Sequence, residues 1–142
     1  MILIRRSPDN KPKRPTAPKM TAHFSANWHE RTDRSLTWLW RWWRSAQFLG
    51  ETEDVGRYRA VVRRRPLHRH QTRRVQYYAL TPEWVVLVTN PVSGHTRFLS
   101  VWPRRWFDRL WRVAQRQTAA HTQAEAARTA REAARRERQA QA

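Results

Sequence analysis

The sequence predicts one small α+β domain, built from an N-terminal Trp-rich helix, a four-stranded antiparallel sheet and a long C-terminal helix. Three observations lead to this fold class. Apolar residues recur at helical spacing early in the chain, alternate at strand spacing in the middle, and return to helical spacing after Pro103. We expect a flexible basic arm at residues 1-22, a single domain at 23-117 and a charged Ala/Arg-rich helical tail at 118-142.

The first expected element is one helix from residue 27 to residue 49. Asn27 can cap its start, and Glu30 follows three residues later, as in a capping box. Gly50 is a suitable stop. The segment SLTWLWRWWRSAQFLG, residues 35 to 50, places four tryptophans within six positions of this helix.

The apolar side chains of this helix cover an arc of roughly 200° at about 100° per residue, which favours packing against a sheet. Trp38 or Trp42, beside Arg41, would then lie at the edge of the packed face. Such edge rings would stack on bases or on a partner protein. A helix lying on a membrane surface is the remaining interpretation.

The sheet is expected after the acidic segment ETED, residues 51 to 54. Apolar and polar residues then alternate, or form a short apolar run, in four segments separated by turn-forming residues. Their short connections favour an antiparallel meander. The predicted strands are residues 57 to 63, 74 to 80, 83 to 89 and 96 to 102, and the third is apolar on both faces, as expected of an internal strand.

The last helix is expected to begin at Pro103. Beside its apolar face, four arginines fall within roughly 60° of one another at helical spacing: Arg105, Arg109, Arg112 and Arg116. Beyond residue 118 the chain is almost entirely Ala, Arg, Glu and Gln, which predicts a solvated helix. Four further arginines share a face there, with glutamates as partial partners: Arg128, Arg131, Arg135 and Arg138, with Glu125, Glu132 and Glu137.

Charge indicates the class of partner. The chain has 29 Lys plus Arg against 11 Asp plus Glu, for a formal net charge of +18. Only three of the basic residues are lysines. Nucleic acid, RNA or DNA, is the commonest polyanion that such a protein meets, and the planar guanidinium group both pairs with phosphate and stacks on bases. An anionic membrane surface and an acidic protein are the alternatives.

The most basic segment, residues 55 to 76, contains no acidic residue. We expect its arginines to line one face of the sheet and to contact the phosphate backbone together with the arginines that follow Pro103. Tyr78 would add a stacking group, so RNA or single strands are slightly preferred as ligands. Sequence-specific recognition of a duplex through its major groove is the alternative. The arginines concerned are Arg57, Arg59, Arg63, Arg64, Arg65, Arg69, Arg73 and Arg74.

A metal-independent ribonuclease is the enzymatic alternative, because RNA cleavage needs only proton transfer and cationic stabilisation. His68, His70 and His95 would transfer protons, Glu83 would act as a base, and Arg97 or Arg73 would stabilise charge. A helix followed by a four-stranded antiparallel sheet also resembles the general layout of small toxin ribonucleases of the RelE and barnase types. No motif of either family is present, so this resemblance assigns no residues.

A third interpretation is a basic subunit of a larger ribonucleoprotein or protein assembly, whose partner covers exposed tryptophans. No cofactor or metal is expected, since the chain has no cysteine, no phosphate-cradling glycine loop and no carboxylate near the His68 and His70 pair. No run approaches the roughly 20 apolar residues of a membrane span. We therefore expect a cytoplasmic protein, typical of a bacterial or phage accessory gene.

Overall fold

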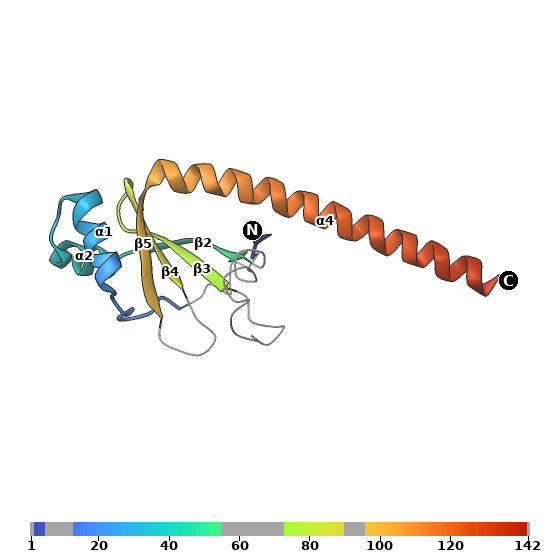
Figure 1. Cartoon of the computed structure of the whole chain (residues 1–142), viewed down its shortest axis with the longest axis horizontal. Coiled ribbons are helices and arrows are strands. Elements are labelled where there is room, and N and C mark those ends of the chain that lie inside the picture. The colour runs from blue at the N-terminus through green and yellow to red at the C-terminus, as the bar shows by residue number, and fades with distance from the viewer. Residues whose placement is uncertain (1, 5–12, 55–72, 90–95, 142) are drawn as a thin grey trace.

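The structure, a computed structural model, describes residues 2-4, 13-54, 73-89 and 96-141. It confirms the predicted α+β class, with a helical N-terminal region, an antiparallel sheet and a long C-terminal helix (Figure 1). Two short helices, α1 (Ala22–Thr32) and α2 (Leu36–Trp43), pack on one face of the sheet. The last helix, α4 (Arg104–Ala140), crosses the other face.

The prediction of one helix over residues 27 to 49 is wrong. Helix α1 begins five residues before Asn27, and the Thr21 side chain caps it by accepting a hydrogen bond from the Phe24 backbone N–H at 3.1 Å. It ends at Asp33, whose φ of 53° lies in the left-handed region that aspartate tolerates better than most residues. The chain therefore turns between α1 and α2, and the Trp28 indole N–H closes the turn by donating to the Ser35 carbonyl at 3.1 Å.

The segment predicted as the end of that helix and the following acidic break instead forms strand β2 (Gln47–Asp54). Tertiary pairing explains this difference, because β2 lies between β1 and β3 and buries two of its polar residues. Glu51 is 2% exposed and Thr52 is 1% exposed, with the Thr52 hydroxyl 3.0 Å from that of Tyr77. The strand predicted at residues 57 to 63 lies outside the described residues.

The remaining strands are β1 (Ile2–Leu3), β3 (Arg73–Ala79), β4 (Trp84–Thr89) and β5 (Arg97–Pro103). They form an antiparallel meander in the order β1-β2-β3-β4-β5. The predicted strands at 74 to 80, 83 to 89 and 96 to 102 are confirmed to within one residue. Strand β4 is internal, as its doubly apolar pattern predicted. The two-residue β1 was not predicted.

Alternation along the strands divides the core in two. On one face of the sheet, Tyr78 and Val86 pack with α1 and α2 around the buried Trp28 and Trp43. On the other face, Tyr77 and its neighbours pack against α4: the second cluster comprises Val75, Tyr77, Val85, Leu87 and Phe107. Both faces of the sheet are therefore apolar and covered by helices.

Part of the N-terminal segment lies against this domain. The Trp43 indole N–H donates to the Pro15 carbonyl at 2.9 Å, and the Arg14 guanidinium donates to the Ala46 carbonyl at 3.1 Å. Lys19 forms a backbone bridge with Arg97 at the start of β5. Residues 13 to 21 of the predicted basic arm thus lie along the domain, and Ile2–Leu3 join its sheet as β1.

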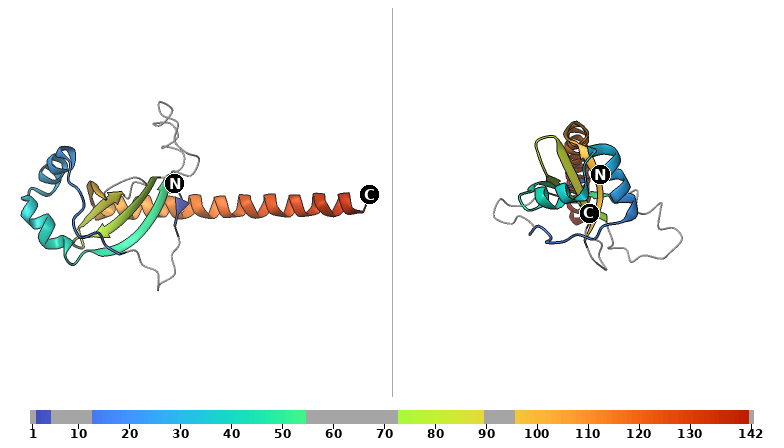
Figure 2. Two further views of the ribbon diagram at one scale, coloured as in Figure 1. Left: turned by 90° about the horizontal axis from the view of Figure 1, so that it is seen from below. Right: turned by 90° about the vertical axis from the view of Figure 1, so that its left-hand side faces the viewer.

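Helix α4 has 37 residues and extends beyond the sheet (Figures 1 and 2). At 1.5 Å per residue its length is about 55 Å. Phe107, Ala114 and Thr118 are its buried residues, and every residue from 119 to 141 is exposed. Among the described residues, no helix combines the length and the apolar character needed to cross a bilayer.

Candidate nucleic-acid interface

Four arginines in the first half of α4 lie on the side of the helix away from its buried residues. Phe107, Ala114 and Thr118 fix the direction of the core, and at about 100° per residue the arginines centre roughly 170° from it. They are Arg105, Arg109, Arg112 and Arg116, and all four are exposed. The packing of α4 therefore leaves these four residues exposed.

The projecting half of α4 adds four more exposed arginines, Arg128, Arg131, Arg135 and Arg138. Helical geometry places all eight within an arc of roughly 160°, and we call this set the arginine face. The carboxylates of α4 all fall outside that arc: Asp108, Glu125, Glu132 and Glu137. The arginine face is therefore free of carboxylates, and two other arginines, Arg104 and Arg136, lie on the side of the helix that carries them.

Ion pairing does not neutralise the arginine face. The two salt bridges on α4 among the described residues join Arg104 to Asp108 at 3.2 Å and His121 to Glu125 at 3.1 Å, and neither includes an arginine of the face. The glutamates predicted as partial partners make no ion pair with these arginines within the described part of the chain. Neighbouring like charges destabilise a helix by roughly 0.2–0.5 kcal/mol per pair, so an anionic ligand would relieve a built-in repulsion.

The second predicted surface, an arginine-lined sheet face, is not found in the described residues. The expectation of an uncovered face is wrong there, because α4 covers the face opposite α1 and α2 with Phe107, Leu110 and Trp111. Arg74 is exposed and pairs with Glu53 in the β2-β3 ladder. Only the backbone of Arg73 is described, and Arg57, Arg59, Arg63, Arg64, Arg65 and Arg69 lie outside the described residues.

Tyr78 is a core residue, and its prediction as a stacking group on the binding surface is wrong. Its side chain is 1% exposed, and its hydroxyl donates to the Gln76 side-chain oxygen at 3.0 Å. Its ring packs edge-on against Trp43, with centroids 5.0 Å apart. The alternation of β3 places Tyr78 beneath α1 and α2, so it is not available to a base.

The tryptophans at the edge of α2 are already stacked on arginines of the same chain. The Arg34 guanidinium lies 4.8 Å from the Trp38 ring and 5.2 Å from the Trp42 ring, and Arg41 lies 4.9 Å from Trp38. Both indoles are half-buried. Among the described residues the exposed tryptophans are Trp40, at 37%, and Trp106, at 39%.

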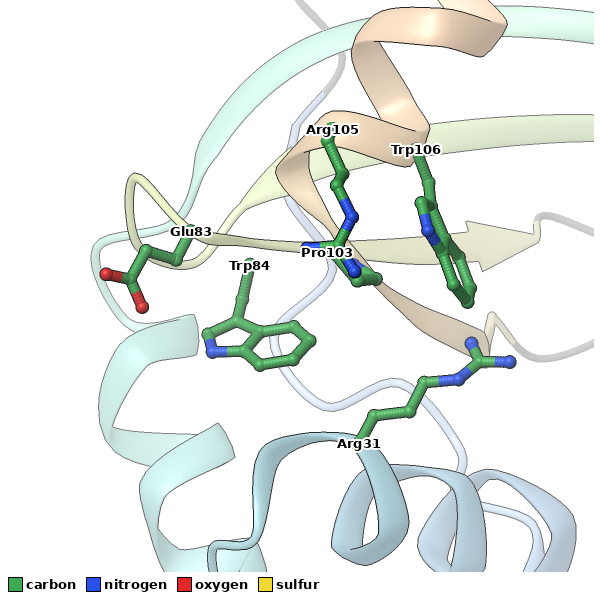
Figure 3. A pocket seen from close by; sticks show the side chains of 6 residues that line it. All are labelled: Arg31, Glu83, Trp84, Pro103, Arg105 and Trp106. Atoms are coloured by element: carbon green, nitrogen blue, oxygen red, sulfur yellow. The ribbon is translucent and has the colours of Figure 1, made fainter.

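A cavity of about 410 Å³ lies where α1, the start of β4 and the first turn of α4 meet (Figure 3). The Arg104 backbone N–H donates to the Glu83 carbonyl at 2.7 Å and ties β4 to α4 there. The cavity brings together two predicted site residues, Glu83 and Arg105. Its complete lining is Arg31, Glu83, Trp84, Pro103, Arg105 and Trp106.

Arg31, Trp84 and Trp106 were not predicted as site residues. The adjacent Arg105 and Trp106 gave a local signal, because they combine charge and an aromatic ring at the start of a helix. Arg31 gave none, since it reaches the cavity only through the packing of α1 on β5, where one guanidinium nitrogen donates to the Ser100 hydroxyl at 3.0 Å and to the Val101 carbonyl at 2.6 Å.

Of the residues predicted for a ribonuclease, the structure describes the side chains of Glu83 and Arg97, and it places these two apart. Trp84, beside Glu83, pairs with Pro103 at one end of β5, whereas Arg97 pairs with Thr89 at the other end. His68, His70 and His95 lie outside the described residues. In the part of the chain that is described, no group of three or more His, Asp or Glu side chains has the arrangement of a metal site.

Comparison with known proteins adds no assignment. No family model, characterised protein or solved structure matches this chain significantly. The function is therefore argued from the residues themselves.

Proposed function

We propose that this protein binds nucleic acid through the phosphate backbone, along the arginine face of α4. One observation carries the proposal: eight exposed arginines share one side of a single helix, and no carboxylate lies among them. A solvated helix held by its own ion pairs would instead interleave opposite charges. A face without carboxylates favours an extended polyanion.

The dimensions of the face suit such a ligand. From Arg105 to Arg138 the helix advances about 50 Å at 1.5 Å per residue. Duplex DNA carries one negative charge per roughly 1.7 Å of axis, so phosphates are available along the whole length. Arginine pairs with phosphate through a planar fork and needs no base to do so. The contact is therefore expected to depend little on sequence.

RNA or single strands are the preferred form of the ligand in this proposal. The exposed Trp106 lies one residue from Arg105, so an aromatic ring is available at one end of the arginine face. The arginines between residues 57 and 74 are a second predicted contact, and a cytoplasmic location is part of the same proposal.

The test is fluorescence anisotropy of labelled single-stranded RNA, single-stranded DNA and duplex DNA, titrated with the full chain across a salt series. If about six phosphates are contacted, affinity falls roughly a thousandfold between 50 and 200 mM salt. The variant Arg109→Gln/Arg116→Gln should weaken binding and reduce the salt slope by about 1.4–1.8.

A matched control removes the same charge from the other side of the helix. Arg104 and Arg136 lie on α4 outside the arc of the arginine face. Arg104→Gln/Arg136→Gln should leave the salt slope nearly unchanged. Equal effects of the two double variants on the salt slope would show that binding depends on the net charge of the protein and not on the arginine face. Weak binding to all three ligands at physiological salt would overturn the proposal and indicate an acidic protein partner.

A further inference from the structure

The cavity between α1, β4 and α4 has the composition of a ligand site. Its volume of about 410 Å³ falls within the roughly 300–1,000 Å³ of small-molecule pockets. Two indoles and two guanidinium groups line it, from Trp84, Trp106, Arg31 and Arg105. Flat aromatic surfaces next to fixed positive charges suit a ligand that is itself a flat ring joined to an anion.

The two indoles are presented toward the same space. In Figure 3, Trp84 and Trp106 both point from their backbones toward α1, and the Arg105 side chain extends between them. Trp84 is half-buried and packs against the core beneath α1 and α2. Trp106 is 39% exposed. One wall is therefore anchored in the domain, and the other is partly exposed, with the Arg31 guanidinium stacked on one face of its ring.

The guanidinium groups supply a positive field in this space. Arg31 is held by its bonds to Ser100 and Val101, and its guanidinium carbon lies 4.9 Å from the centre of the Trp106 ring. The Glu83 carboxylate points away from both indoles (Figure 3). Helix α4 also begins at this cavity, which adds the positive end of its dipole.

We propose that this cavity binds one unpaired nucleotide, with its base stacked on the indoles of Trp84 and Trp106 and its phosphate held by Arg105 and Arg31. This inference rests on the proposed function, because Arg105 is also the first residue of the arginine face. A strand whose phosphates follow that face reaches the cavity at its end. A paired base cannot enter, so the cavity adds a preference for single strands over duplexes.

The test compares two labelled strands of equal length, one with bases and one abasic, by anisotropy with the full chain. Trp106→Ala should lower affinity for the strand with bases by roughly 5- to 150-fold, the usual effect of removing one base–aromatic stack. Its affinity for the abasic strand should not change. The control is Trp40→Ala, which removes an indole of similar exposure, 37%, from α2 and outside the cavity lining. It should affect neither strand.

The outcomes separate this inference from the proposed function. If Trp106→Ala leaves binding of the strand with bases unchanged, or weakens both strands equally, the nucleotide site is overturned while backbone binding stands. If neither strand binds, the proposed function fails, and the cavity is then tested separately with a mononucleotide. A nucleoside 5′-monophosphate should then shift the indole N–H resonances of Trp84 and Trp106 in NMR spectra. No shift, or the same shift with inorganic phosphate alone, would overturn the site.

Discussion

The indole of Trp111 in α4 lies against the backbone of Gly50 in β2. A Cβ atom added to Gly50 would come within 2.8 Å of Cζ2 and of Cζ3 of this ring, and closer still to Cη2. Side chains essentially never approach this closely, so the packing of α4 on the sheet depends on a residue without a Cβ. The predicted role of Gly50 as a helix stop is replaced by this close approach.

Gly50→Ala should therefore lower the free energy of unfolding by about 1–3 kcal/mol, as overpacking usually does. Urea unfolding followed by tryptophan fluorescence would measure the change. In a Trp111→Ala background the same substitution should cost much less, because the clashing ring is absent. If the two effects add to within about 0.5 kcal/mol, the two residues are not coupled and this account is wrong.

The Thr118 hydroxyl joins α4 to the N-terminal strand. It accepts from the Leu3 backbone N–H at 2.9 Å and donates to the Ala114 carbonyl at 2.7 Å, and Thr118 is 7% exposed. Thr118→Val should cost about 1–3 kcal/mol, because the Leu3 N–H loses its acceptor. Hydrogen exchange at Leu3 should accelerate.

Thr122→Val is the matched control for that substitution. The Thr122 hydroxyl donates only within the helix, to the Thr118 carbonyl at 2.9 Å. Its loss should leave exchange at Leu3 unchanged. Equal acceleration in both variants would show that the Thr118 hydroxyl does not hold β1.

The two halves of α4 should contribute unequally to stability. Ala114 is 0% exposed and belongs to the half of α4 that packs on the sheet, whereas Ala130 is exposed and belongs to the projecting half. Proline inside a helix costs about 3 kcal/mol or more. Ala114→Pro should therefore destabilise the domain by at least that amount, while Ala130→Pro should reduce far-UV helicity and leave the thermal midpoint of the near-UV signal unchanged. A lower midpoint for Ala130→Pro would show that the projecting half supports the core.

Removing charge from the projecting half should separate binding from stability. Replacement of Arg128, Arg131, Arg135 and Arg138 by glutamine should weaken nucleic-acid binding and reduce its salt slope by about 2.8–3.6 if all four contact phosphate. Like-charge repulsion falls at the same time, so the thermal midpoint should stay the same or rise. A lower midpoint, measured without ligand, would indicate that these arginines make stabilising contacts within the protein.

The candidate site was predictable wherever it depends on a regular period. The sequence predicted both groups of four arginines on α4 from their helical spacing, and it assigned only the first group to nucleic-acid binding. The cavity was not predictable, since Arg31 and Trp84 are far apart in the chain and meet only when α1 packs on β5. Tyr78 was wrongly predicted to lie on the binding surface. An aromatic residue on a strand has the same local sequence pattern whether or not a helix covers that face of the sheet.

By itself the sequence determined the α+β class, three of the four long strands and the last helix, because alternation and helical periodicity are local properties of the chain. Tertiary structure decided the rest. The segment from Gln47 to Asp54 has little strand character of its own and becomes β2 because β1 and β3 satisfy its backbone hydrogen bonds. Tertiary packing also decided that α4 covers the second face of the sheet, since the apolar residues of both strands and helix are buried only when the two meet.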